Sequence, residues 1–386
     1  MLFTAPALTA EDQYVISLVE ANQRNLRHQV AEPSRWFGLL RRVALARSIR
    51  GSNSIEGYHV TLDDAFAAVG GEEPLEADDA AWAAVQGYRT AMTYVLQLAD
   101  EEDIEIDESL IRALHFMTIS YDLTKRPGRY RKGDVFVVDE DLDEIVYEGP
   151  APELVQGLMQ ELVDGLPQGL NAEHVLVQAA MAHLNFVMIH PFKDGNGRMG
   201  RALQSLVLIR GHIAAAPEFC SIEEYLGANE LAYYEVLKSV GAGAWHPERD
   251  CGEWIRFCLR AHYRQTLTVL RRTKEAQRYW NVAEREVERA RLPERCTATV
   301  AHALSGFAVR NATYRGMEQV TEAVASRDLK ALVDAGIFQP HGEKRGRYYS
   351  PVERLRDEHS QIKKSVRSQV DIAADPYELA KADTGV

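Results

Sequence analysis

The residues best suited to chemistry in this 386-residue chain stand in one stretch, His190 to Arg201, which reads HPFKDGNGRMGR. An imidazole titrates near neutral pH, so His190 can take a proton from an attacking hydroxyl group. A glycine-containing turn that opens a helix exposes backbone N–H groups, which bind anions together with the helix dipole. This combination favours phosphoryl or nucleotidyl transfer.

The charged residues of the stretch fit the same chemistry. Arg198 and Arg201 are three residues apart, so both guanidiniums can flank one polyphosphate at the start of a helix. Asp194 is poorly suited to an anion but well suited to Mg²⁺ that bridges phosphate oxygens. The backbone donors that would cradle the phosphates belong to Gly195, Asn196 and Gly197.

Two other interpretations of the stretch are weaker. Gly195 to Gly200 satisfies GxGxxG, but the preceding apolar run is too long for a strand and no βαβ unit surrounds it, which argues against a dinucleotide site. A single histidine beside a proline is usually a core residue, whereas His190 has chemical partners in sequence. Phe192 is expected to hold the loop against the core.

The surrounding sequence predicts a mainly helical protein. The apolar run AEHVLVQAAMAHLNFVMI (172–189) predicts a buried helix, with Asn171 as its N-cap, that leads directly into the stretch. VFVV (135–138) and IVY (145–147) predict a β-hairpin, and Thr61 predicts a helix start. Apolar periodicity predicts helices at 12–31, 34–50, 61–69, 77–100, 107–120, 152–165, 172–189, 198–210, 229–239 and 251–291.

Composition excludes several classes of protein. A formal charge of −13 disfavours a surface that binds nucleic acid as a whole. No run approaches the ~20 consecutive apolar residues of a membrane span, and the N-terminus lacks the basic and apolar regions of an export signal. The four cysteines contain no CxxC pair, which predicts reduced, core-packing thiols in a cytoplasmic protein.

The C-terminal third predicts a separate module. The helical stretch 251–291 ends before Pro293, and helix, helix and hairpin patterns follow, as in a winged helix. Ser326–Val333 would be the recognition helix, with Lys344, Arg345 and Arg347 on the wing. That helix alternates acidic and basic residues, so protein docking or dimerisation is favoured over DNA binding. The polar tail from Asp371 is expected to be frayed.

HPFKDGNGRMGR resembles the HPFx(D/E)GNGRxxR signature of Fic domains at every defined position. The resemblance includes GRYRKGDV (128–135) and 232–259, and it covers roughly 52–260. It implies a Fic-fold helical core with a short β-hairpin flap. Together with the winged-helix pattern of the C-terminal third, we expect a mainly α protein with a C-terminal winged-helix-like domain. The expected division is an N-terminal helical region, a Fic core, a helical connector, a winged-helix-like domain and a polar helix with a tail, at 1–105, 106–260, 261–295, 296–352 and 353–386.

The resemblance also implies an activity, the transfer of AMP from ATP to a hydroxyl side chain of a target protein, with Mg²⁺. His190 would be the general base, Asp194 the metal ligand, and Arg201 the partner of the γ-phosphate. The flap (135–148) would dock the target's main chain as an added strand. Its acidic residues, Asp139, Glu140, Asp141, Asp143 and Glu144, suit either a basic partner or a solvated turn. Tyr233 and Tyr234 would line the nucleobase pocket.

SNSIEG, from Ser52 to Gly57, fits the (S/T)xxxE(G/N) inhibitory motif of the same family. The resemblance implies that Glu56 pairs with Arg201, an interaction of order ~4 kcal/mol in Coulomb energy before desolvation. Arg201 would then be withheld from the γ-phosphate. In some family members this glutamate orients a water that removes AMP, so the sequence leaves writing, erasing or both open.

Two alternatives remain at this point. A transcriptional regulator could use the Fic domain as a nucleotide sensor and the winged helix to bind DNA. A Fic enzyme could instead use another donor, such as phosphocholine, although Arg198 and Arg201 favour a triphosphate. Dimerisation is common in the family, but the chain carries no interface signature.

Overall fold

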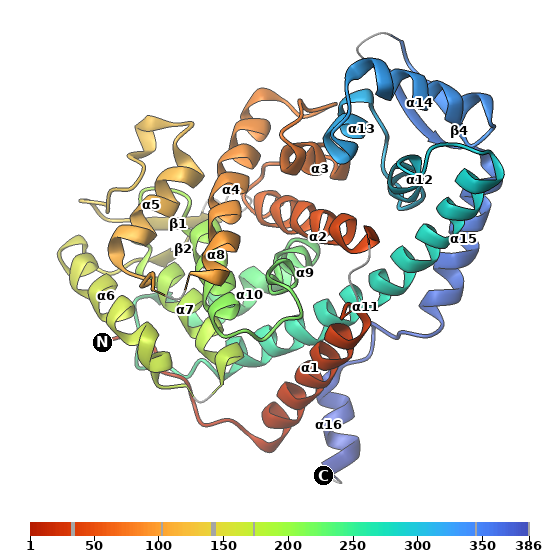
Figure 1. Ribbon diagram of the computed structural model, residues 1–386. Coiled ribbons are helices and arrows are strands. Elements are labelled where there is room, and N and C mark those ends of the chain that lie inside the picture. The colour runs from red at the N-terminus through yellow and green to blue at the C-terminus, as the bar shows by residue number, and fades with distance from the viewer. Residues whose placement is uncertain (32–34, 102, 140–143, 173, 344–345, 385–386) are drawn as a thin grey trace.

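The computed structural model describes all residues except 32–34, 102, 140–143, 173, 344–345 and 385–386. The described chain is mainly helical, as predicted (Figure 1). The α-helices in chain order are α1 (Ala10–Gln29), α2 (Arg35–Ser54), α3 (Leu62–Gly70), α4 (Asp79–Gln97), α5 (Glu108–Ile119), α6 (Pro152–Gly165), α7 (Val175–Ile189), α8 (Asn196–Arg210), α9 (Glu223–Ala228), α10 (Glu230–Gly241), α11 (Gly252–Arg289), α12 (Cys296–Leu304), α13 (Asn311–Glu318), α14 (Glu322–Asp334), α15 (Glu353–Arg367) and α16 (Pro376–Thr384).

Helices α7 and α8 form the centre of the fold and pack against each other (Figure 1). α7 is buried from Ala179 to Ile189, which confirms the predicted buried helix. Its predicted N-cap is wrong. Residues 166–171 form a separate turn in which Gly169 and Leu170 have positive φ angles, so the helix begins only at Val175. The cap is His174, whose Nδ1 accepts the N–H of Leu176 at 3.2 Å.

The start of α3 confirms the prediction at Thr61. The Thr61 hydroxyl accepts the backbone N–H of Asp64 at 3.1 Å, which satisfies one of the unpaired donors at the helix N-terminus. The Asp64 carboxylate in turn accepts the N–H of Leu75 at 2.5 Å. This pairing holds the segment after α3 against its first turn.

A three-stranded sheet of order β1-β2-β3 lies beside α7. β1 (Phe136–Asp139) and β2 (Glu144–Glu148) pair antiparallel, with Phe136 opposite Glu148, and confirm the predicted hairpin. β3 (Gly243–Ala244) pairs parallel to β2 and was not foreseen. β1 forms an edge, and the hairpin exposes Phe136, Val138 and Ile145. Glu140, Asp141 and Asp143 of the expected acidic flap lie outside the described residues.

Helix α11 is one continuous helix of 38 residues. It packs against α1 and α7 near its start and against α12 and α15 farther along (Figure 1). The division expected at residue 260 falls inside this helix, so the core and the connector share one rigid element.

The residues after α11 fold against the N-terminal helices. β4 (Phe338–His341) and β5 (Tyr348–Pro351) form the expected hairpin. Arg310 pairs with Glu72 at 3.0 Å, and the N–H of Ala308 donates to Asp63 at 2.9 Å, so this C-terminal module (residues 296–351) is fastened to the segment around α3. The winged-helix assignment stays a prediction, and Lys344 and Arg345 of the expected wing lie outside the described residues.

The described part of the polar tail, up to Thr384, contains α16 and packs on the fold rather than fraying. Tyr377 in α16 is buried, and its hydroxyl donates to Asp12 of α1 at 2.9 Å. The expectation was wrong because the sequence did not reveal that Asp12 offers a buried acceptor. All four cysteines are buried with free thiols, as predicted. Among the described residues, none of the helices has the length and apolar character needed to cross a membrane.

Candidate active site

His190 ends α7 in a left-handed conformation, with φ of 50°. Its Nδ1 lies 3.2 Å from the carbonyl oxygen of Val187. Because a carbonyl only accepts, Nδ1 carries the proton and Nε2 is left as the basic nitrogen. Burial lowers the pKa of His190, and the Arg131 guanidinium adds to this effect. The side chain is therefore an unprotonated base at neutral pH.

The loop after His190 is held in shape by Asn196. Its amide accepts the N–H of Phe192 and donates to the carbonyl of Phe192, both at 2.9 Å. Phe192 is fully buried, in agreement with its expected structural role. The Asn196 side chain thus shapes the loop, while its backbone N–H stays at the start of the helix, where the phosphate nest is expected.

His115 of α5 fixes the same loop from the other side and was missed in the sequence. Its Nε2 lies 2.9 Å from the carbonyl of Asp194, and its Nδ1 accepts the N–H of Gly128 at 2.8 Å. Its ring stacks on Phe192 with centroids 3.6 Å apart. Both nitrogens are thus used by the neutral ring, and burial lowers the pKa of His115 to about 4.

The first turn of α8 has the geometry of an anion site. Gly195 is the N-cap with φ of 75°, and the N–H of Met199 already bonds to the Gly195 carbonyl at 3.0 Å. The N–H groups of residues 196–198 therefore have no acceptor within the helix. A Cβ at Gly197 would collide with the Glu56 carboxylate. A carboxylate thus already lies over the first turn of this helix.

Asp194 lies beside this turn with one oxygen on the protein backbone. Its Oδ1 accepts the N–H of Gly195 at 2.6 Å, and its Oδ2 lies 3.0 Å from the Lys125 ammonium. No group of three or more potential ligands occurs among the described residues. One carboxylate next to a phosphate-type site suits Mg²⁺, which commonly takes few protein ligands plus substrate oxygens. Asp194 is therefore a suitable ligand for the predicted Mg²⁺. Its Oδ2, the oxygen that could bind the metal, already contacts the Lys125 ammonium.

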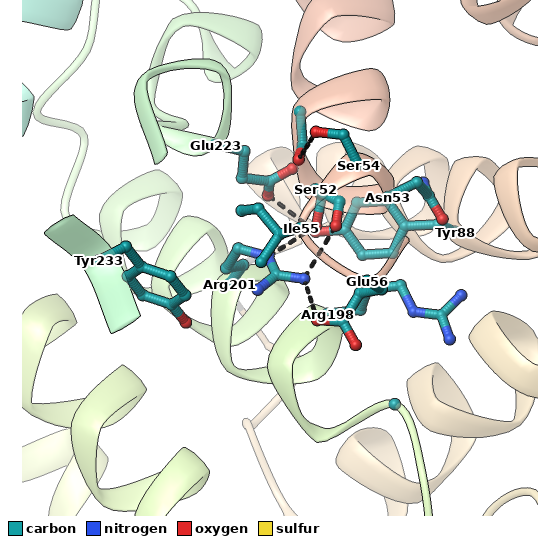
Figure 2. A network of polar contacts seen from close by, with 12 residues as sticks. Ser52, Asn53, Ser54, Ile55, Glu56, Tyr88, Arg198, Arg201, Glu223 and Tyr233 are labelled. Atoms are coloured by element: carbon teal, nitrogen blue, oxygen red, sulfur yellow. Dashed lines mark hydrogen bonds and ion pairs between the residues drawn. The ribbon is translucent and has the colours of Figure 1, made fainter. Parts of the chain in front are cut away.

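Arg201 is almost completely buried and pairs with the predicted inhibitory motif (Figure 2). Its Nη2 lies 2.6 Å from Oε1 of Glu56 and 3.0 Å from the Ser52 carbonyl. Its Nε donates to the Ser52 hydroxyl at 2.8 Å. Burial alone would lower the pKa of Arg201, but the Glu56 carboxylate together with Tyr233 and Tyr88 offsets it and the pKa is raised. Nη1 is buried without a hydrogen-bond partner among the described residues.

Arg198 does not share that partner. Its Nη1 and Nη2 both lie 3.3 Å from the Tyr121 hydroxyl, and the guanidinium lies over the Tyr58 ring at 5.2 Å. Figure 2 shows the Arg198 guanidinium directed away from Arg201. The sequence predicted that both arginines flank one anion, whereas in the structure Arg198 and Arg201 contact different residues.

Residues 52–57 form a turn, which we call the 52–57 turn. Its shape is that of a helix C-terminus. The N–H of Tyr58 bonds to the Asn53 carbonyl, and the N–H of Gly57 bonds to the Ser54 carbonyl, both at 3.0 Å. This is a Schellman motif, with Gly57 left-handed at φ of 80°. A glycine after the glutamate therefore ends α2 and leaves Glu56 facing α8.

The side chains of Tyr233 and Tyr234 have different surroundings and different hydrogen-bond partners. Tyr233 is buried, and its hydroxyl bonds to Nε2 of His183 at 3.0 Å. Tyr234 is 44% exposed, and its hydroxyl donates to the Ile55 carbonyl in the 52–57 turn at 2.9 Å. The two predicted nucleobase residues thus divide between the core and this turn.

A buried carboxylate behind Arg201 was also missed. Glu223 of α9 accepts the hydroxyls of Tyr88 and Ser48, each at 2.8 Å, and burial raises its pKa. Figure 2 shows Glu223 together with Tyr88 and Arg201. α9 approaches α2 so closely that a Cβ at Gly51 would collide with the backbone of Glu223. Glycine at this position thus allows α9 to support the helix that carries the 52–57 turn.

Comparison with known proteins agrees with this geometry. Residues 105–208 match the model of the Fic/DOC family. The chain is 32% identical to protein adenylyltransferase Fic of Nematostella vectensis over 229 residues, which is 56% of this chain and 47% of that protein. It is 37% identical to a Fido domain-containing protein of Dictyostelium discoideum over 115 residues, which is 28% of this chain and 74% of that protein. The chain spans about half or less of the first curated relatives it matches.

Two solved structures share the fold. A Fic family protein from Desulfovibrio desulfuricans G20 matches with a TM-score of 0.56 at 20% identity, covering 91% of this chain and 98% of that one. Fic-1 from C. elegans matches with a TM-score of 0.52 at 21% identity, covering 67% of this chain and 72% of that one. From the matching model, the relatives and the fold, this chain belongs to the Fic/DOC family.

Proposed function

We propose that the chain is a protein adenylyltransferase that transfers AMP from ATP to a hydroxyl side chain of a target protein, and that Glu56 inhibits it. One observation carries the proposal: the Glu56 carboxylate lies over the anion-binding turn of α8 and holds Arg201, close enough to His190 to influence its pKa. Relatives of the chain are named protein adenylyltransferases.

The reaction follows from the roles of the site residues. The target hydroxyl oxygen attacks the α-phosphorus of ATP, its proton passes to Nε2 of His190, and the bond to the departing pyrophosphate breaks. The N–H groups at the start of α8 and the guanidiniums of Arg198 and Arg201 hold the phosphates. Asp194 would hold Mg²⁺, which when bound neutralises phosphate charge.

In this inhibition, Glu56 competes with the γ-phosphate of ATP for Arg201 and for the N-terminus of α8. While Glu56 lies at the start of α8, the γ-phosphate lacks both Arg201 and the space above Gly197. ATP that binds without them has its α-phosphate misplaced for in-line attack, and such misplacement costs large factors in rate. The edge strand β1 would receive the target's main chain.

The test compares wild type, Glu56→Gly, and Glu56→Gly with His190→Ala, each incubated with labelled ATP and a lysate. We expect Glu56→Gly to label itself and target proteins at least tenfold more than wild type, with the label lost in the double variant. Mass spectrometry should find added AMP on hydroxyl side chains. Equal labelling by all three proteins would contradict the proposal.

A further inference from the structure

A cavity of about 220 Å³ lies between α2, α11, α12 and α15. None of its lining residues belongs to the 190–195 loop or to the 52–57 turn. Figure 1 shows α11 running past α2 and toward α12 and α15 in this part of the molecule. The cavity is therefore separate from the candidate active site and lies where the N-terminal helices meet the C-terminal module.

Five basic side chains from three helices line this cavity. They are Arg47 of α2, Arg271 and Arg272 of α11, and Lys363 and Arg367 of α15. One carboxylate lines it with them, Glu275, whose Oε1 lies 3.7 Å from Nε of Arg271. The positive charge of the lining is thus far from balanced within the cavity.

Part of that charge is balanced from outside the cavity. Arg272 pairs with both oxygens of Glu224, at 2.5 and 2.6 Å, and Arg47 lies 3.3 Å from the same carboxylate. Lys363 and Arg367 have no carboxylate within 4 Å among the described residues. Burial and the nearby Arg272 lower the pKa of Arg47 to about 10, so the cluster repels itself. An anion in the cavity would relieve that repulsion.

Buried polar atoms in the lining lack partners. The Tyr279 hydroxyl, Nε of Arg271, Nε of Arg47 and Oε1 of Glu275 form no hydrogen bond with any described residue, although Tyr279 is only 3% exposed. Buried polar groups are nearly always hydrogen-bonded, and leaving one unpaired costs free energy. The Tyr279 hydroxyl and the guanidinium N–H groups can donate to an oxygen-rich ligand, and the Glu275 oxygen is an acceptor beside them that lacks a donor.

The cavity lining also contains a group of aromatic side chains, which we call the aromatic wall. The rings of Tyr279 and His359 stack in parallel, with centroids 5.2 Å apart, and Trp36 and Phe307 complete the wall. A bare phosphate ion would use only the basic side. Pockets that enclose drug-sized ligands measure roughly 300–1,000 Å³, so this cavity is too small to enclose a nucleoside triphosphate.

We propose that this cavity binds a small phosphate-bearing compound, with its phosphate against Arg271, Arg367 and Tyr279 and its carbon portion against the aromatic wall. The ligand would join α2 to α15. The site does not depend on the proposed transferase activity, because it shares no residue with the candidate active site.

Calorimetric titration of the full chain tests the site, with phenyl phosphate and inorganic phosphate as probes. We expect phenyl phosphate to bind at least tenfold more tightly than inorganic phosphate, since only the former contacts the aromatic wall. Arg271→Met, Arg367→Met and Tyr279→Phe should each raise the Kd for phenyl phosphate by about tenfold or more. Rising salt should weaken binding to the wild type.

Two controls separate this site from other sources of binding. Arg278→Met alters an α11 arginine that lies outside the cavity lining and donates to Ser365, and it should keep the wild-type Kd. Arg201→Met should also keep it, although it alters the candidate active site. Because Arg367 is exposed, its substitution leaves the fold intact, which the melting temperature checks.

Three outcomes would overturn the proposal. One is no binding of phenyl phosphate by the wild type at millimolar concentration. Another is binding that disappears in Arg201→Met but persists in Arg367→Met, which would place the probe in the active site. The third is equal affinity for the two probes, which would remove the carbon-binding wall from the site.

Discussion

Ser52 and Glu56 hold the same guanidinium, that of Arg201, through Nε at 2.8 Å and Nη2 at 2.6 Å. The two residues are four apart, so at a helix C-terminus they lie on one face, one turn from each other. The spacing of the (S/T)xxxE motif is thus the spacing of two contacts to one arginine. The glycine that follows is needed for the left-handed residue that ends the helix.

Tyr234→Phe should loosen the 52–57 turn without removing the aromatic ring. The hydroxyl that donates to the Ile55 carbonyl is lost, and a single hydrogen bond contributes about 1 kcal/mol. We expect basal AMP transfer to rise a few-fold at unchanged KM for ATP. In the Glu56→Gly background the same substitution should have no effect, because no inhibitory contact remains. An equal rise in both backgrounds would contradict this role.

Gly57→Val should also raise basal transfer, whereas Gly57→Asn should not. Both residues add a Cβ, and nothing lies within 4 Å of that position, so space is not limiting. The φ of 80° is strained for valine, a branched residue, but asparagine adopts it readily. Labelling assays on the two variants therefore compare the effect of backbone strain at residue 57 on basal AMP transfer. Similar rates for both would show that the left-handed residue does not position Glu56.

The pH dependence of transfer by Glu56→Gly should report His190. Burial lowers its pKa below the usual value of about 6.5, and the Glu56 carboxylate opposes this shift. Removing Glu56 should lower the pKa further, so kcat/KM should decline only below pH 6.5. Arg131→Met should move this decline to higher pH, because Arg131 also lowers the pKa. A decline above pH 6.5 in Glu56→Gly would contradict the assignment of His190 as the base.

Much of the fold could be predicted because its signals are local. Both ends of helix 152–165 were predicted to the residue, and the hairpin strands were predicted to within one or two residues. The spacing of apolar residues and the turn residues determine both elements. Asn171 failed as a cap because Gly169 and Leu170 turn the chain first.

Long-range contacts explain what the sequence could not show. His115 stands in the apolar run ALHFM, and Glu223 is one of two adjacent glutamates, so neither sequence context indicates a role in the site. Their importance comes from partners 79 and 135 residues away, Asp194 and Tyr88. Tyr234 was placed by resemblance near a nucleobase, but its contact with Ile55 arises only when α10 packs beside the end of α2. No spacing in the chain encodes such a pairing.

Buried neutral histidines should make the fold sensitive to acid. In the folded chain burial lowers the pKa to about 4 for His115 and about 3 for His183, His262 and His302, against about 6.5 when unfolded. Between these values the unfolded chain binds more protons, so the free energy of unfolding should fall as pH falls below 6.5. Each histidine contributes up to about 1.4 kcal/mol per pH unit.

His302 offers the sharpest test of this dependence. Its ring packs against Phe66 and Phe307, with centroids 4.4 and 4.7 Å away, and neither nitrogen has a partner among the described residues. His302→Leu fills the position with an apolar side chain and removes the proton uptake, so denaturation curves should show a shallower loss of stability between pH 6.5 and 4. His246→Asn, at an exposed histidine, should leave the slope unchanged. If His302→Leu and wild type lose stability in parallel, protonation of His302 does not contribute to the loss of stability in acid.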